Sequence, residues 1–196
     1  VSYSRGFIQI LLEILMNAVD HSKRPEGKSI KNIYVNVDKK SGKISVHNDG
    51  AGIDIVRAKD FKSTDGVHAK RVIYIPEMLF AHLRTSSNYN DTEERIVVGT
   101  NGIGAKATVI FSKSFVVETI DKKRKKRFTQ EYKNNLSIIE EPIIEEIGDA
   151  DKKIKSIESG TRITYLPDYK KFGMSGGLDD DTISIIKKYT YDLIGI

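Results

Sequence analysis

An amphipathic helix is the first element that the hydrophobic pattern predicts. Residues 7–19 are nearly all apolar, and the polar exceptions Gln9, Glu13 and Asn17 are spaced by four, with Asp20 three positions later. This spacing places the four side chains along one stripe of a helix. Exposed helix faces usually carry long Lys, Arg and Glu side chains, whereas this stripe carries amides and short acceptors. The stripe is either an ordinary solvated face or the wall of a functional cleft.

Strands dominate the rest of the pattern. Apolar and polar residues alternate over 33–37 and 44–46 with Ser41-Gly42 between them, which predicts a β-hairpin. Further strands are expected at 96–98, 115–120, 127–132, 137–144 and 161–165. Helices are expected at the start of 54–70, at 76–83, through 109–111 and at 182–193. Helices that bracket mostly antiparallel strands predict an α+β fold, a two-layer α/β sandwich with helices on one face of a mostly antiparallel mixed sheet.

Composition narrows the class of protein. The 196 residues suit one domain spanning 1–196, and 39% hydrophobic residues suffice for a core. A net charge of +5 favours polyanionic partners such as nucleotides or nucleic acid. The chain has no Cys, which excludes disulfides, thiolate metal sites and a cysteine nucleophile, and suits an intracellular compartment. No apolar run approaches the ~18 residues of a membrane span. We therefore expect an intracellular protein without a membrane partner and, since the chain opens almost inside a buried helix, a piece of a longer one.

A glycine-containing loop follows the predicted hairpin directly. It reads Asn48-Asp49-Gly50-Ala51-Gly52-Ile53. Two glycines beside a carboxylate indicate a tight turn that brings backbone close to another group. Asp49 either forms a plain Asx turn or accepts a hydrogen bond from a ligand.

A second glycine-rich segment, residues 99–107, precedes a short apolar stretch. Glycines before a helix let backbone N–H groups face an anion, and Lys106 adds a positive charge, so the segment is typical of a phosphate site. It does not fit a Walker loop, because Ala107 stands where Ser or Thr is required. Gly102, Gly104 and Ala107 do fit the G-x-G-x-x-A pattern of dinucleotide-binding folds, with Glu118 ending the next strand. That alternative needs repeated β-α-β units, whereas strand follows strand here.

Three other polar segments have both a structural and a functional interpretation. The run 84–91 of hydroxyls and amides is a solvated loop or a set of contacts to ribose and phosphate. Arg24 is a loop charge or a phosphate contact. The basic run 122–127 is a solvated hairpin tip or a contact for DNA.

The motifs together resemble a known superfamily. Glu13 with Asn17, Asp49 with Gly50 and Gly52, and Gly102-x-Gly104 look like the nucleotide motifs of the ATPases that include gyrase, certain chaperones, sensor histidine kinases and mismatch-repair proteins. Segments 85–89, 101–106, 110–112 and 115–119 are similar to the eukaryotic and large-virus type IIA DNA topoisomerases. The chain departs from the cellular eukaryotic pattern at His21, Asp49 and Thr100, where those enzymes usually have Asn, Asn and Arg.

The resemblance implies a Bergerat-type ATP-binding fold with ATP and Mg²⁺ as cofactors. Glu13 would be the general base, Asn17 the Mg²⁺ ligand and Lys106 a catalytic phosphate contact. The other implied ATP contacts are Asp20, Arg24, Asp49 at the adenine amino group, Gly50, Gly52, Ile53, Ser86, Ser87, Asn88, Asn101, Gly102, Ile103, Gly104 and Ala105.

The resemblance also implies how such a chain would act. In the family, ATP closes a homodimeric gate that captures DNA, in the nucleus or, for a viral enzyme, where viral DNA is replicated. The transducer and DNA-gate domains are expected to lie outside this chain, which should bind ATP, hydrolyse it poorly and stay monomeric without it. The alternatives are a nucleotide-switched module that binds ATP without hydrolysing it, and a dinucleotide-binding oxidoreductase that binds NAD.

Overall fold

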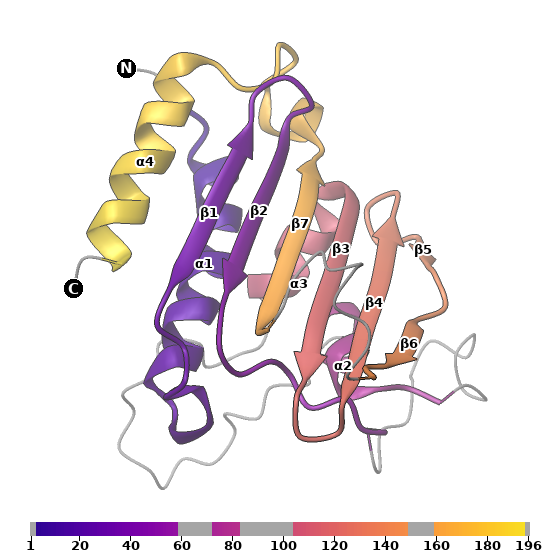
Figure 1. Cartoon of the computed structure of the whole chain (residues 1–196). Coiled ribbons are helices and arrows are strands. Elements are labelled where there is room, and N and C mark those ends of the chain that lie inside the picture. Colours follow the sequence, from indigo (N-terminus) through magenta and orange to yellow (C-terminus); the bar gives the residue numbers. More distant parts are fainter. Residues whose placement is uncertain (1–2, 59–71, 83–103, 149–158, 195–196) are drawn as a thin grey trace, which may run out of the picture.

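The fold is an antiparallel sheet with helices packed on one of its faces (Figure 1). The computed structural model describes residues 3–58, 72–82, 104–148 and 159–194. Helices α1 (Arg5–Lys23), α2 (Ile75–Ala81) and α3 (Gly104–Ile110) lie behind the sheet in the view of Figure 1, and α4 (Asp180–Ile194) lies beside the first strand. Short 3₁₀ turns occur at η1 (Pro25–Gly27) and η2 (Tyr169–Phe172).

Seven strands form the sheet in the order β1-β2-β7-β3-β4-β5, and β6 also pairs with β4. Every ladder among them is antiparallel. The strands are β1 (Ile33–Asp38), β2 (Lys43–Asn48), β3 (Ser112–Asp121), β4 (Lys126–Lys133), β5 (Ile138–Ile139), β6 (Ile143–Glu146) and β7 (Thr161–Pro167). Because β7 comes last in the chain yet lies between β2 and β3, the sheet joins the two ends of the sequence.

The core lies between the helices and one face of the sheet. In β2, Ile44 and Val46 are buried while Lys43 is exposed, as period-2 alternation requires. At the centre, the Phe115 ring lies 6.1 Å from the Tyr132 ring and 6.0 Å from the Tyr165 ring. The opposite face carries polar residues such as Ser45, His47 and Thr164, and the described helices leave it uncovered (Figure 1).

The first helix is built as its sequence predicts. Ser4 caps its start by accepting a hydrogen bond from Phe7 N at 3.5 Å, and the helix ends before Pro25, which cannot continue it. Its apolar side chains pack into the core: Phe7, Ile8, Ile10, Leu11, Ile14, Leu15 and Ala18. The polar stripe is thereby turned away from the sheet.

The expected fold class is confirmed, and three details are corrected. No helix forms over residues 54–58, where Arg57 instead makes a β-bridge with Tyr74. The strand expected at 137–144 is two short strands separated at Pro142, which cannot donate a ladder hydrogen bond. The dinucleotide-binding alternative is wrong, because that fold is built on adjacent parallel strands, whereas every ladder of the described sheet is antiparallel. Residues 59–70 and 96–98 lie outside the described ranges.

None of the helices in the described ranges is both long and apolar enough to span a lipid bilayer.

Candidate functional site

The polar stripe of α1 meets α3. Glu13 is partly buried, and Asn17, one turn later, is exposed. Gln9 Nε2 donates a hydrogen bond to Glu13 Oε1 at 2.7 Å, so the first amide of the stripe orients the carboxylate. Asp20, at the end of the stripe, is 5% exposed. The stripe therefore supplies the Glu13 carboxylate, which is fixed by a hydrogen bond, and one turn later the Asn17 amide, which is exposed to solvent.

The Glu13 carboxylate lies directly against the first residue of α3. A Cβ added to Gly104 would stand 1.8 Å from Glu13 Oε2 and 2.5 Å from Glu13 Cδ, so only glycine fits there without displacing the carboxylate. The two helices are also joined by a hydrogen bond from Thr108 Oγ1 to Ile10 O at 2.9 Å. Glu13 is thus placed by its own helix and by the close approach of α3.

Lys106 lies within α3, two residues after its first residue, rather than in the loop before the helix. Its side chain is 1% exposed, and this burial lowers the pKa of the ammonium to about 8. An anion placed close to this group would raise its pKa again, because an opposite charge favours the protonated form. With a pKa of about 8, Lys106 is already mostly charged at neutral pH, and a bound phosphate would stabilise that charged form.

Asp49 points to the uncovered face of the sheet. Its Oδ1 accepts from Lys31 N at 2.7 Å and Asn32 N at 3.0 Å, and its Oδ2 accepts from Asn32 Nδ2 at 2.8 Å. Partial burial disfavours the charged carboxylate, but these donors outweigh it, so the pKa of Asp49 lies below its ordinary value. Because α1 covers the other face, the structure does not bring Asp49 together with Glu13. This orientation favours a different residue for the adenine contact that was expected at Asp49.

Asn48, one residue earlier, is the polar side chain that faces the helices. It continues the buried alternation of β2 and is 5% exposed. Its Nδ2 donates to Asp49 O at 3.1 Å and Ala51 O at 3.2 Å, which leaves Oδ1 as an acceptor. Thr161 lies opposite Asn48 in the β2–β7 ladder, and its Oγ1 is 2.8 Å from Thr119 Oγ1. Sequence reasoning missed Asn48 and Thr161, although extending the alternation of β2 by one step indicates Asn48.

The glycines of the 48–53 loop are explained by contacts within the chain. Gly50 has a φ of +76°, and a Cβ there would stand 2.4 Å from Ser29 O. A Cβ on Gly52 would stand 2.3 Å from Ile120 O. Ile53 N donates to Thr119 Oγ1 at 2.8 Å. The close approach that the glycines predicted is confirmed, and in the structure it joins backbone to backbone.

His21 and Arg24 close the same end of α1. Arg24 N donates to His21 O at 3.2 Å and so caps the helix. The His21 ring hydrogen-bonds the backbone of Ala51, and its Nε2 is buried without a hydrogen-bond partner. Burial lowers the pKa of His21, Arg24 lowers it further, and Glu26 partly opposes them. The imidazole is therefore held mainly neutral next to the 48–53 loop.

Several expected contacts lie outside the described residues, namely Ser86, Ser87, Asn88, Asn101, Gly102 and Ile103. Ala105 falls inside α3. In the part of the chain that is described, no group of three or more His, Asp or Glu side chains could hold a metal ion. The described residues therefore offer a metal ion at this site no cluster of protein carboxylates as its ligands.

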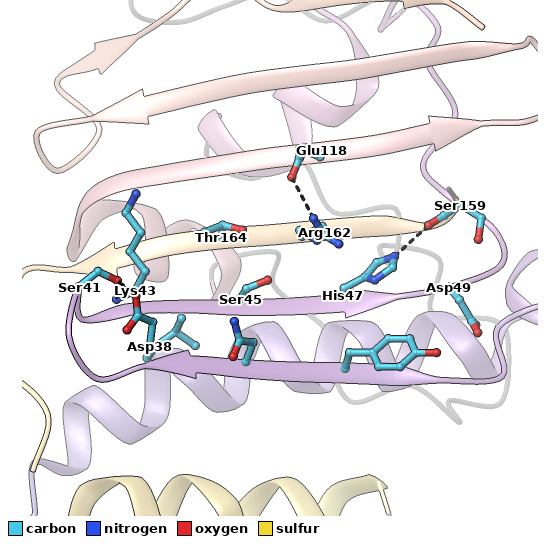
Figure 2. A pocket seen from close by; sticks show the side chains of 13 residues that line it. Asp38, Ser41, Lys43, Ser45, His47, Asp49, Glu118, Ser159, Arg162 and Thr164 are labelled. Atoms are coloured by element: carbon cyan, nitrogen blue, oxygen red, sulfur yellow. Dashed lines mark hydrogen bonds and ion pairs between the residues drawn. The ribbon is translucent and has the colours of Figure 1, made fainter. Parts of the chain in front are cut away.

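A separate hollow of about 810 Å³ occupies the uncovered face of the sheet. Figure 2 shows Asp49, His47 and Arg162 projecting into it from neighbouring strands, with Glu118 beside Arg162. His47 Nε2 lies 2.9 Å from Ser159 O. Neither Glu13 nor Asn17 lines this hollow, so it is distinct from the site between α1 and α3.

Comparison with curated proteins finds relatives that are similar to this chain over nearly all of its residues. It is 41% identical over 195 residues to DNA topoisomerase 2 of Acanthamoeba polyphaga mimivirus, covering 98% of the chain and 14% of that protein. It is 39% identical to DNA topoisomerase 2 of Penicillium chrysogenum, covering 100% of the chain and 11% of that protein. The chain thus spans a small part of the relatives that it matches. No protein-family model matches the sequence.

Solved structures give the same result in three dimensions. The ATPase region of Saccharomyces cerevisiae topoisomerase II matches with a TM-score of 0.83 and 39% identity, over 98% of this chain and 46% of that one. The 43K ATPase domain of Thermus thermophilus gyrase B matches with a TM-score of 0.62 and 22% identity, over 93% and 39%. At that identity the second likeness shows the fold alone. The expected Bergerat-type fold, also called the GHKL ATPase fold, is confirmed.

Proposed function

This chain is homologous over its whole length to the ATPase region of type II DNA topoisomerases, and from that premise we propose that it binds ATP and hydrolyses it to ADP and phosphate. The observation that carries the proposal is the position of the Glu13 carboxylate, which is oriented by Gln9 and packed against Gly104. Asn17 follows Glu13 on the same helix, one turn later. A carboxylate held this way at the edge of an ATP-binding fold suits a general base.

Glu13 is assigned the proton-transfer step. Its carboxylate takes a proton from the attacking water while the water oxygen bonds to the γ-phosphorus and the bond from that phosphorus to the bridging oxygen breaks. ADP leaves with the electron pair of the broken bond. The hydrogen bond from Gln9 fixes the direction of one carboxylate oxygen and leaves the other for the water.

Asn17 is assigned as the protein ligand of Mg²⁺. Mg²⁺ commonly binds through one or two protein oxygens, substrate phosphates and several waters, which fits an exposed amide without a carboxylate cluster around it. The ion would supply charge neutralisation of the phosphates.

Adenine recognition is assigned to Asn48 in place of Asp49. Both Nδ2 hydrogens of Asn48 are engaged by Asp49 O and Ala51 O, so Oδ1 is left to accept from the adenine amino group. Guanine would present a carbonyl at that position, and two facing acceptors in a dry pocket cost ~1–3 kcal/mol. ATP is therefore preferred over GTP.

The remaining assignments follow the resemblance. Lys106 is assigned a phosphate contact, and a phosphate beside its ammonium would raise the lowered pKa. Asp20 and Arg24 border the site at the end of α1. The segments 86–88 and 101–105 supply the other ribose and phosphate contacts, while Gly50, Gly52 and Ile53 shape the loop beside the base.

The whole-protein activity is proposed by extension. In a longer protein of the relatives' kind, ATP binding would close a homodimeric gate around DNA inside the cell. The transducer and DNA-gate functions would come from regions other than residues 1–196.

A titration tests the nucleotide assignment. We expect a non-hydrolysable ATP analogue to bind in the presence of Mg²⁺ and NAD to show no saturable binding, each followed by calorimetry on the same preparation. Tight NAD binding with no ATP-analogue binding would overturn the proposal. Binding of ATP without any turnover under single-turnover conditions would favour the nucleotide-switched module.

A further inference from the structure

The turn between β3 and β4 is the most strongly charged segment of the chain. Residues 122–127 are all Lys or Arg. Because β2 and β3 both run antiparallel to β7, this turn lies at the end of the sheet where β2 finishes, whereas the β1–β2 turn lies at the opposite end (Figure 1). Lys40, in the β1–β2 turn, therefore lies far from the lysines of the β3–β4 turn.

Arg124 braces the turn from inside. Its Nη1 lies 2.7 Å from Asp121 Oδ2 and 3.0 Å from Asp54 Oδ1, and its backbone N donates to Asp121 Oδ1 at 3.0 Å. Ile55 N also donates to Asp121 Oδ2 at 2.9 Å. Asp121 is 4% exposed. The turn is therefore tied to the segment that follows the 48–53 loop, and the charge of Arg124 is used in tying it.

The two strand residues of the basic run lie opposite acidic residues. Lys126 lies opposite Glu146, and Arg127 lies opposite Glu145, in the β4–β6 ladder. Cross-strand pairs of opposite charge stabilise a sheet by a few tenths of a kcal/mol to about 1 kcal/mol. Arg124 faces two carboxylates, so the turn keeps the charges of Lys122, Lys123 and Lys125 beside one carboxylate in excess.

Lys122, Lys123 and Lys125 are those uncompensated charges. All three are exposed, and none forms an ion pair with a residue of the described ranges. Lys125 has a φ of +51°, a conformation in which Gly or Asn is usual. A braced turn that carries three free ammonium groups presents a fixed positive surface to solvent.

We propose that Lys122, Lys123 and Lys125 contact the phosphate backbone of double-stranded DNA. A preformed turn orders few additional groups on binding, and lysine is a point charge suited to phosphate contacts without base specificity. The choice of DNA among polyanions rests on the proposed function. The contact itself is separate from the ATP site, because none of these lysines lies on α1, α3 or the 48–53 loop.

The salt dependence gives the expected size of the effect. Each phosphate contact on duplex DNA contributes about −0.9 to the slope of log K against log salt. Three contacts therefore contribute roughly −2.7, and losing them at 0.1 M salt lowers affinity by roughly 500-fold relative to a 1 M reference.

The test compares charge-matched variants on a short DNA duplex of random sequence by fluorescence anisotropy at several salt concentrations. The triple variant Lys122→Gln, Lys123→Gln and Lys125→Gln should lose the affinity and flatten the slope, while the three Lys→Arg changes should retain both. The control replaces three exposed lysines elsewhere and lowers the net charge equally: Lys40→Gln, Lys170→Gln and Lys187→Gln.

Equal loss in the control would overturn the proposal, because net charge alone would then explain binding. Unchanged affinity and slope in the turn variant would overturn it too, as would tighter binding of the unsubstituted chain to anionic phosphatidylserine vesicles than to DNA. ATP-analogue affinity is measured in the turn variant as well. It should be unchanged, and absence of ATP binding from the unsubstituted chain would refute the proposed function without deciding the DNA contact.

Discussion

Replacing Gly104 by Ala tests the placement of Glu13 without touching the carboxylate chemically. The added Cβ would stand 1.8 Å from Glu13 Oε2, whereas unbonded atoms pack at about 3.5 Å. The oxygen must therefore retreat by about 1.5 Å or more. The nearest atoms all belong to the flexible end of one side chain, so Glu13 moves and the backbones of α1 and α3 stay in place.

The two consequences differ sharply in size. Displacing a reacting group by about 1 Å can cost 10²-fold in rate, so hydrolysis should fall roughly 10²-fold. The fold loses the Gln9 hydrogen bond, worth about 1 kcal/mol, and gains only part of the advantage of about 0.5–1 kcal/mol that Ala has over Gly inside a helix, because Gly104 is the first residue of α3. The free energy of unfolding should therefore change by less than about 1 kcal/mol.

Single-turnover hydrolysis of radiolabelled ATP and urea unfolding measure both quantities on one preparation. Gly6→Ala is the matched control, since a Cβ on Gly6 of α1 meets only Phe172 carbons at 3.6 Å, an ordinary contact. Hydrolysis at the unsubstituted rate in Gly104→Ala, with ATP bound, would refute the view that the packed position of Glu13 matters for catalysis. A comparable loss in Gly6→Ala would refute the specificity of the effect.

Three other outcomes are expected. Glu13→Gln should keep ATP-analogue binding and lower turnover ~10²-fold or more, as expected for a lost general base, and unchanged turnover would remove Glu13 from the chemistry. Asn17→Ala should weaken the Mg²⁺-dependent part of ATP-analogue binding, and an unchanged Mg²⁺ dependence in isothermal titration would remove the ligand assignment. Asn48→Ala should weaken ATP binding ~5- to 150-fold and erase the preference over GTP, whereas Asp49→Ala should leave affinity intact and lower the urea midpoint; the reverse pattern would restore Asp49 as the base contact. The pKa of His21 is lowered in the folded chain, so the unfolded chain binds more protons near and below pH 6.5, and the free energy of unfolding should decrease as pH falls through that range. In His21→Gln this decrease should be smaller, and an equal pH dependence of the free energy of unfolding in urea would contradict the burial argument.

The regular elements could be predicted because their patterns are local. Spacing of three and four along residues 7–19 predicted α1, and alternation around Ser41-Gly42 predicted the β1–β2 hairpin. Pro76 marked the start of α2. The segment 54–58 lacks periodicity, and its bridge from Arg57 to Tyr74 joins residues far apart in sequence. No local signal reports such a pairing.

The site was predicted in part. The placing of Glu13 on an accessible stripe follows from spacing alone, but its contact with Gly104 depends on how α3 packs on α1. The prediction for Asp49 rested on the chemistry of its carboxylate alone, whereas the register of β2 places this side chain on the face of the sheet opposite α1. Thr161 could not be found from sequence, since it comes beside Asn48 only through the insertion of β7 next to β2.

The division of the β4 edge at Pro142 has a consequence for solubility. β5 and β6 pair with different halves of β4, and they contain two and four residues. A long unpaired strand edge is a template on which another chain can add and begin aggregation. Here the edge is divided into strands of two and four residues, and such short edge strands are poor templates for that growth. On the other side of the sheet, α4 lies beside β1 (Figure 1), and a helix that covers an edge strand is one of the ways in which proteins keep a second chain from adding to the sheet.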